Sequence, residues 1–175
     1  MGQSLQTQTI YLTFPPALKR QATKLNTLTE QLTSAPMEDD LHVSLSKTFY
    51  AKHWHIQPLA KTLADTLRGI ALPSALLFDH SSSYSNEHGT RFFVAMDLCA
   101  SDQGKLIFDL ELIKLVDNAI GSFGFEPYYP DPKLHMSLAS GIAPILENEL
   151  SPARLELSGP FAIFLRAGNQ SHRLL

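Results

Sequence analysis

Two short segments of this chain carry nearly the same sequence, Leu41-His42-Val43-Ser44-Leu45 and Leu134-His135-Met136-Ser137-Leu138. In each, apolar and polar residues alternate, which predicts a half-buried β-strand with histidine and serine on one face. A bare His-x-Ser arises by chance roughly 0.6 times in a chain of this composition, but its repetition with both flanking leucines does not. The repeat therefore predicts two similar halves, each contributing one strand to a shared site.

The composition fits one domain that can bury a core. The chain has 175 residues, of which 44% are hydrophobic and 18% are charged, so we exclude general disorder and expect a single domain over residues 1–175, built from two lobes. The single cysteine, Cys99, excludes an internal disulfide framework and an all-cysteine zinc cage. No apolar run approaches a membrane span, and residues 1–10 are too polar for a signal peptide, so we expect an intracellular protein with no membrane partner.

The order of the expected elements predicts an α+β fold. Leucine spacing indicates a helix over residues 18–32, and similar apolar spacing indicates helices over 56–70 and 106–120, with a short one at 144–150. The serine-rich tract 81–86 lies in an expected loop over 80–90. We expect strands at residues 9–14, 41–46, 75–79, 91–98, 134–139, 153–157, 161–167 and 171–175, with a turn at Gly168-Asn169.

The paired motifs suit the chemistry of a phosphodiester. Histidine and serine two positions apart on a strand share a face, so two adjacent strands would bring two imidazoles and two hydroxyls together. The hydroxyls can donate hydrogen bonds to the phosphate oxygens. One imidazole can remove a proton from an attacking hydroxyl while the other protonates the leaving oxygen, since the ordinary histidine pKa of about 6.5 allows both states near neutral pH. This chemistry needs no metal or other cofactor, and the residues alone do not say which histidine is the base.

The motifs resemble those of the 2H phosphoesterase superfamily, in which paired His-x-Ser or His-x-Thr strands lie about 90 residues apart. Within it, Tyr128-Tyr129-Pro130-Asp131-Pro132 before the second motif resembles the U6 snRNA 3′-end-processing phosphodiesterases. Lys52-His53-Trp54-His55 with Pro58, Thr90-Arg91-Phe92-Phe93-Val94 and Gly168-Asn169 also resemble that family, whose members often carry a longer N-terminal extension. The resemblance implies a bilobal α+β fold of two antiparallel sheets, flanked by helices, with a central groove.

The same resemblance implies roles for six residues. His42 and His135 would be catalytic, Ser44 and Ser137 would bind the phosphate, and Tyr129 would stack on a nucleobase, with Asn169 as a second nucleotide contact. The implied reaction is metal-independent 3′→5′ trimming of the oligouridine end of U6 snRNA in the nucleus. A ribose 2′-hydroxyl attacks its own phosphate and leaves a 2′,3′-cyclic phosphate, which some members open. Because the nucleophile is a 2′-hydroxyl, the substrate is RNA and not DNA. We expect a monomer.

Several other residues allow structural interpretations. His53 and His55 have no third metal ligand at suitable spacing, so a metal site is disfavoured. Lys47, Lys52 and Lys133 are equally consistent with RNA contacts and with solvated charges, and Tyr50, Trp54 and Tyr128 with stacking and with core packing. Cys99 is expected to be a small buried residue rather than a nucleophile.

Two alternative functions share the four motif residues. One is another 2H reaction, such as a cyclic phosphodiesterase or a 2′–5′ RNA ligase-like activity, and only the Tyr129-Pro130-Asp131-Pro132 segment favours the first interpretation over it. The other is a non-catalytic protein that binds RNA 3′ ends. The net charge of −3 argues against a broad basic surface for duplexes, and favours brief contact with a flexible 3′ end.

Overall fold

The fold was determined from a computed structural model, which describes residues 5–13, 35–36, 41–101, 111–144 and 154–175. Two helices and ten strands lie in these ranges, and the class is α+β as predicted. The helices are α2 (His53–Leu67) and α4 (Ile113–Gly121). The strands are β1 (Leu5–Thr13), β2 (Ala35–Pro36), β3 (His42–Ser44), β4 (Phe49–Lys52), β5 (Ala75–Ser85), β6 (Phe92–Ser101), β7 (His135–Gly141), β8 (Arg154–Ser158), β9 (Ala162–Ala167) and β10 (Gln170–Arg173).

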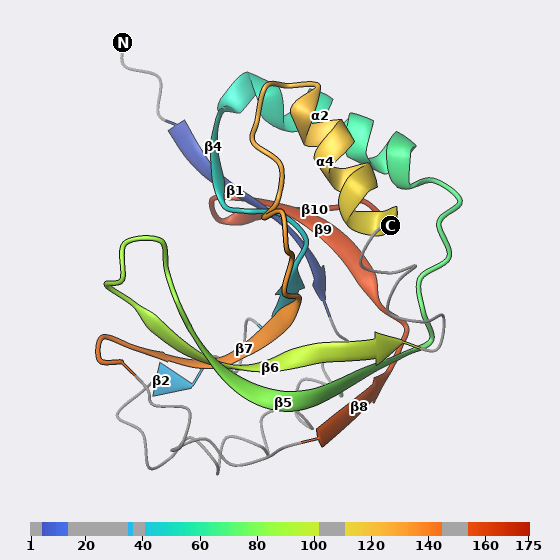
Figure 1. Cartoon of the computed structure of the whole chain (residues 1–175). Helices are drawn as coiled ribbons and strands as arrows, with labels where there is room; N and C mark the ends of the chain where they lie inside the picture. Colours follow the sequence, from blue (N-terminus) through green and yellow to red (C-terminus); the bar gives the residue numbers. More distant parts are fainter. Residues whose placement is uncertain (1–4, 14–34, 37–40, 102–110, 145–153) are drawn as a thin grey trace.

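The strands form one antiparallel hydrogen-bonded path, in the order β10-β9-β1-β3-β7-β6-β5-β8, with β4 beside β1 and β2 beside β7. Two halves are visible in Figure 1: a helical lobe of β10, β9, β1, β3 and β4 with both helices, and a second lobe of β7, β6, β5, β8 and β2. The strand pairing between the halves consists of one residue pair, Val43 opposite Met136. The two expected sheets are therefore joined into a single sheet at the two His-x-Ser strands.

Each helix buries one apolar face against the sheet of the helical lobe. In α2 the buried residues Ile56, Leu59, Leu63 and Leu67 recur at helical spacing, and in α4 Val116 and Ile120 do the same. Leu59, Leu63 and Leu67 of α2 and both α4 residues belong to one buried cluster with Ile10 of β1 and with Ile163 and Leu165 of β9, and these three strand residues are fully buried. The helices therefore cover one face of β1 and β9 and leave the other face uncovered by α2 and α4 (Figure 1). No helix within the described ranges is long and apolar enough to cross a membrane.

The structure corrects two sequence predictions. The tract 81–86, predicted as a loop, continues strand β5 as far as Ser85, because β6 provides a hydrogen-bonded partner along its length. The turn is shorter and spans residues 86–90, where the side-chain oxygen of Asn86 accepts hydrogen bonds from the backbone of Thr90 and Arg91. Strand β4 was not predicted, and it forms because it pairs with the first half of β1.

Helix α2 begins at His53, three residues before its expected start, and Gly69 follows its end with a φ of +84°. The expected helices at 18–32 and 144–150, and the start of the one expected at 106, lie outside the described residues or largely so. The last expected strand, 171–175, is found as β10, and Gly168-Asn169 forms the predicted turn before it.

Candidate active site

The pairing of β3 with β7 brings both His-x-Ser motifs onto one face of the sheet. Val43 lies opposite Met136, so in an antiparallel pair Ser44 faces His135 and His42 faces Ser137. Directly opposite residues have Cβ atoms about 4.5–5.5 Å apart, and diagonal ones such as the two histidines about 7–8 Å. Val43 and Met136 point to the other face and are fully buried, which fixes the register of the four polar residues.

His135 is held in one orientation and is biased toward its neutral form. Its Nδ1 atom lies 2.8 Å from the backbone oxygen of Lys133, so Nδ1–H donates and Nε2 keeps its lone pair when the ring is neutral. Burial lowers the pKa of His135 below its ordinary value, against the opposing effects of the Lys133 hydrogen bond and the nearby Asp97 charge. A neutral imidazole with a fixed tautomer is prepared to accept a proton at Nε2.

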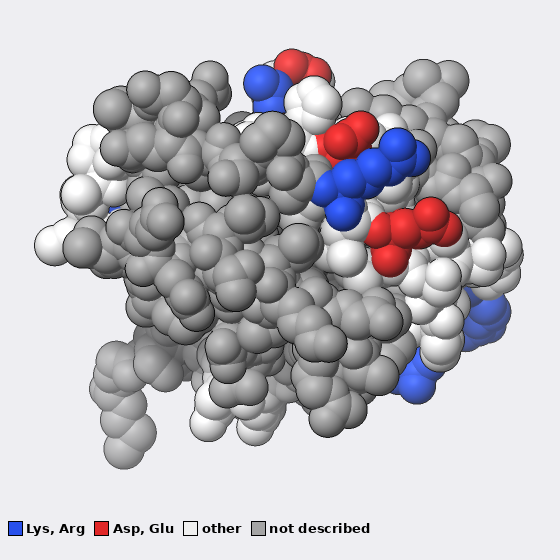
Figure 2. All heavy atoms as spheres, turned by 90° about the horizontal axis from the view of Figure 1, so that it is seen from below, with Lys and Arg blue, Asp and Glu red and all other residues white. Residues whose placement is uncertain are grey.

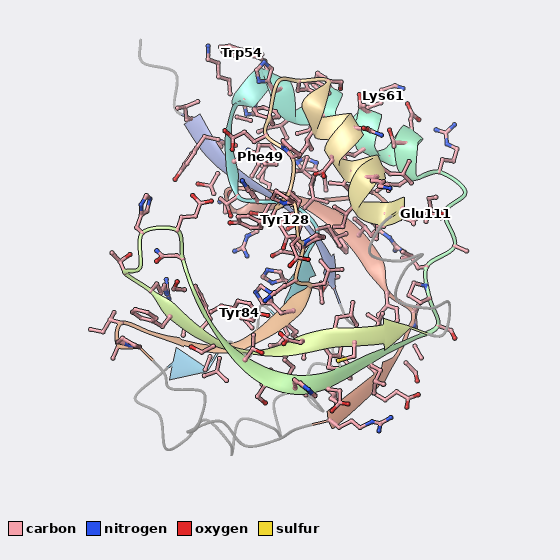
Figure 3. All side chains as sticks on the ribbon, viewed as in Figure 1. Phe49, Trp54, Lys61, Tyr84, Glu111 and Tyr128 are labelled. Atoms are coloured by element: carbon pink, nitrogen blue, oxygen red, sulfur yellow. The ribbon has the colours of Figure 1, made fainter. Side chains whose placement is uncertain are left out.

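A tyrosine stacks directly on His135. The Tyr84 ring lies 4.1 Å from the His135 ring, at an interplanar angle of 14°. The Tyr84 hydroxyl and the Ser82 hydroxyl each donate a 2.6 Å hydrogen bond to a different oxygen of Asp97. Asp97 is paired with His135 across β6 and β7, so the three residues support the ring from the neighbouring strands. Figure 3 shows Tyr84 pointing toward the middle of the molecule.

This support was missed from the sequence. Tyr84 and Ser82 lie in the tract predicted as a loop, where the alternation of side chains carries no information. Asp97 is the one charged residue in the strand Phe92–Ser101, and this isolated charge could have indicated from the sequence that Asp97 has hydrogen-bond partners. A half-buried carboxylate on such a strand needs hydrogen-bond donors nearby.

A second tyrosine contacts His42 on the other side of the site. The Tyr11 ring centroid lies 5.0 Å from that of His42, tilted by 54°, and it stacks on Phe164 at 6.0 Å. The hydroxyls of Tyr11 and Ser171 lie 3.3 Å apart. Each histidine therefore has a tyrosine neighbour from its own lobe.

Tyr129 lies at the surface, between groups of both lobes. It is 44% exposed, its hydroxyl donates a 3.1 Å hydrogen bond to Glu87 at the β5–β6 turn, and Lys47 Nζ lies 4.6 Å from the ring centroid. Lys47 also forms an ion pair with Glu126 at 3.7 Å. An exposed aromatic face beside a lysine is suited to stacking with a base next to a phosphate.

The neighbouring Tyr128 is buried, and its backbone N–H donates to Asp117, so it packs in the core. Burial, with smaller contributions from Tyr129 and Asp117, raises the pKa of Tyr128 to about 12. Asn169 is exposed in the turn between β9 and β10. The β9 residue opposite Tyr11 is Phe164, five positions before Asn169, so the structure places Asn169 along the strands from the four motif residues and not among them.

The remaining candidates have structural surroundings. His55 lies against Phe123 and Phe125, with ring centroids 6.3 Å and 6.0 Å away, while His53 is exposed. Cys99 is partly buried, and its thiol lies 3.5 Å from the backbone oxygen of Asp97. Within the part of the chain that the structure describes, no three His, Cys, Asp or Glu side chains are grouped to hold a metal ion.

Two His-x-Ser strands that pair at the junction of two lobes in an α+β fold are the arrangement that the resemblance to the 2H phosphoesterase superfamily implies. Residues 4–158 match the family described as "HVSL: Uncharacterised conserved protein", and the chain belongs to this family. The four letters of that description are those of His42, Val43, Ser44 and Leu45.

Part of this chain is similar in sequence to U6 snRNA phosphodiesterase 1 of Danio rerio and of Dictyostelium discoideum. U6 snRNA phosphodiesterase 1 of Danio rerio is 30% identical over 123 residues, which cover 70% of this chain and 43% of that protein. The chain thus spans less than half the length of this relative.

Two solved structures resemble almost the whole chain. Usb1 of Kluyveromyces marxianus with uridine monophosphate has a TM-score of 0.60 and 14% identity, covering 97% of each chain. LigT of E. coli complexed with 3′-AMP has a TM-score of 0.59 and 14% identity, covering 97% of this chain and 94% of LigT. These likenesses establish the fold.

Proposed function

We propose that this protein is a metal-independent RNA phosphodiesterase that removes nucleotides in the 3′→5′ direction from the oligouridine end of U6 snRNA, in the nucleus. The observation that carries the proposal is the pairing of Val43 with Met136, which brings the two His-x-Ser motifs together on one face. The likeness to U6 snRNA phosphodiesterase 1 supports the choice of RNA and of the oligouridine end.

His42, His135, Ser44 and Ser137 are proposed as the reacting and phosphate-binding groups. The 2′-hydroxyl of the penultimate ribose loses its proton to Nε2 of His135, and its oxygen forms a bond to phosphorus. The bond from phosphorus to the O5′ atom of the last nucleoside breaks, and His42 donates a proton to that oxygen. The products are an RNA with a 2′,3′-cyclic phosphate and a free nucleoside. The low pKa of His135 favours this residue as the proton acceptor.

The serines and the aromatic residue are assigned to binding. Ser44 and Ser137 donate hydrogen bonds to the non-bridging phosphate oxygens, whose charge grows in the transition state. Tyr129 stacks on a base of the 3′ end, and Asn169 remains a predicted second nucleotide contact. No metal or cofactor takes part, the substrate is not DNA, and the active form is a monomer of one domain.

The direct test is incubation with a 3′-uridylated RNA in EDTA, followed by mass spectrometry of the new terminus. We expect shortened RNA that ends in a cyclic or a terminal phosphate. Variants H42A and H135A should each lose about 10²–10⁴-fold in kcat, since each removes one proton transfer. The exposed His53 provides the matched control, and H53A should keep the wild-type rate. Binding of uridylate without cleavage by the wild-type protein would contradict the proposal and leave a non-catalytic 3′-end binder.

A second experiment separates the base from the acid. A uridine 3′-phosphate esterified with 4-nitrophenol has a leaving group that needs no protonation. With this substrate, H42A should recover most of the wild-type rate, while H135A should stay inactive. The reverse result would exchange the two roles.

Substrate length separates the RNA nuclease from the other 2H reactions. The nuclease should turn over an oligouridylate efficiently and a nucleoside 2′,3′-cyclic phosphate slowly, if at all. Efficient turnover of the cyclic compound, with no activity on the oligomer, would instead assign a cyclic phosphodiesterase or a 2′–5′ ligase-like enzyme.

A further inference from the structure

The face of the helical lobe that α2 and α4 leave uncovered is continuous with the candidate active site. In β1, Tyr11 lies opposite Ser44 and Thr13 lies opposite His42. Alternate residues of β1 share a face, so Thr9, Thr7 and Leu5 continue from the site toward the N-terminal end of the strand. Leu5 lies six positions before Tyr11, which is roughly 20 Å at 3.4 Å per residue. The site thus opens onto a strip long enough for a few nucleotides.

Positive charge gathers on this face. Strand register puts Lys52 of β4, Arg166 of β9 and Arg173 of β10 on the same side as Tyr11, and all three are exposed. The sequences of the four strands β1, β4, β9 and β10 contain no aspartate or glutamate. The chain as a whole has 17 acidic and 14 basic residues, so this segregation is not a consequence of composition.

The outer side of the second lobe differs from this face in how its charged side chains are distributed. Figure 2, seen from the side of β5 and β8, shows acidic and basic side chains next to each other among the described residues. There Arg154 of β8 is paired in register with Asp79 of β5. A polyanion is therefore attracted more strongly to the face beside the active site than to this mixed surface.

Aromatic side chains accompany the cations. Tyr50 lies opposite Thr7 and is 64% exposed, and Trp54 is 48% exposed at the start of α2. Lys52 Nζ lies 5.1 Å from the Trp54 ring centroid. In Figure 3, Trp54 lies at the outer end of the helical lobe, whereas Tyr84 lies near the middle of the molecule. Exposed rings interleaved with cations on a sheet are the arrangement with which proteins hold single-stranded nucleic acid, since bases stack on the rings while phosphates meet the cations.

We propose that the open face of β4, β1, β9 and β10 binds the single-stranded RNA that lies on the 5′ side of the cleaved phosphate. The inference rests on the proposed function, in which only one nucleotide lies on the 3′ side, so any longer chain must leave the site in the 5′ direction. The negative phosphates then follow the cations of this face, and Tyr50 and Trp54 stack with bases several positions upstream.

The test compares a short with a long substrate. A charge variant, K52Q/R166Q/R173Q, and an aromatic variant, Y50A/W54A, are measured with UpU and with a ten-nucleotide oligouridylate. The long substrate extends over more of these residues than UpU does, so the ratio of kcat/KM for the long substrate to that for UpU should fall about 5-fold or more in both variants. R154Q and I142A, which change an exposed cation and an exposed apolar side chain on the second lobe, should leave the ratio at the wild-type value.

Binding is measured separately, by fluorescence anisotropy, with an oligouridylate whose penultimate residue lacks the attacking 2′-hydroxyl. The charge variant should bind more weakly, and its slope of log K against log salt should become shallower by about 2, because three phosphate contacts are lost. The altered residues are exposed, so melting temperatures near that of the wild-type protein should accompany the loss.

Three results would overturn the proposal. They are unchanged binding in both variants, an unchanged salt slope, and an equal fall in kcat/KM for both substrates. An inactive wild-type protein that still binds the oligomer through these residues would refute the nuclease and keep the RNA-binding face, so the two proposals fail separately.

Discussion

Removal of the Tyr84 hydroxyl tests the support of His135. In Y84F, Asp97 loses the donor to one carboxylate oxygen and keeps Ser82 as the donor to the other. A hydrogen bond to a charged group contributes about 1.5–3 kcal/mol, so the free energy of unfolding should fall by about 2 kcal/mol. Burial, and then the hydrogen bond to Asp97, raise the pKa of Tyr84 far above its ordinary value, so the hydroxyl remains a donor throughout the pH range of the assay.

The measurement is urea denaturation at neutral pH, with Y50F as the matched control. Tyr50 is 64% exposed, so loss of its hydroxyl should change the free energy of unfolding by less than about 0.5 kcal/mol. A variant Y84F as stable as Y50F would refute the assignment of the Tyr84–Asp97 hydrogen bond as a stabilising contact.

Activity separates the hydroxyl from the ring. Y84F keeps the aromatic ring that lies 4.1 Å from His135, so the imidazole should stay oriented and kcat should fall by less than tenfold. Y84L also removes the stacked ring pair, which contributes about 0.5–1.5 kcal/mol. If His135 depends on this ring for its orientation, kcat must be lower in Y84L than in Y84F, with KM nearly unchanged. Equal kcat values would show that the Lys133 hydrogen bond alone orients the imidazole.

Four further outcomes are expected. EDTA should leave turnover of uridylated RNA unchanged, which an assay with and without the chelator checks. S44A and S137A should each lower kcat less than the histidine variants do, because they remove a hydrogen bond to the phosphate and no proton carrier. In urea titrations the free energy of unfolding should fall as the pH drops below 6.5, since burial lowers the pKa of His135 and the unfolded chain binds the proton first; H135N should show a smaller fall. M136A and M96A should each lose about 2–5 kcal/mol of stability, because both side chains are fully buried, but only M136A should also lower kcat by disturbing the β3–β7 junction.

Local patterns in the sequence were sufficient for most of the elements. Apolar spacing identified α2, and alternation identified β3 and β7, because both periods are properties of a single segment of backbone. The class of fold followed from the order of the segments and from the resemblance carried by the motifs. Strand β4 was missed because its four residues are held by β1 and carry too short an alternation to be recognised alone.

The sequence by itself determined that His42 and Ser44 share one face of a strand, and that His135 and Ser137 share one face of another. Only the tertiary structure decided that these faces are the same one, since the pairing of Val43 with Met136 joins segments distant in the chain. Only the tertiary structure likewise brings the Tyr84 ring onto His135, and places beside the site the strands β4, β1, β9 and β10, which contain no aspartate or glutamate. Contacts between distant strands depend on register and on burial of the opposite face, and no period within one segment encodes them.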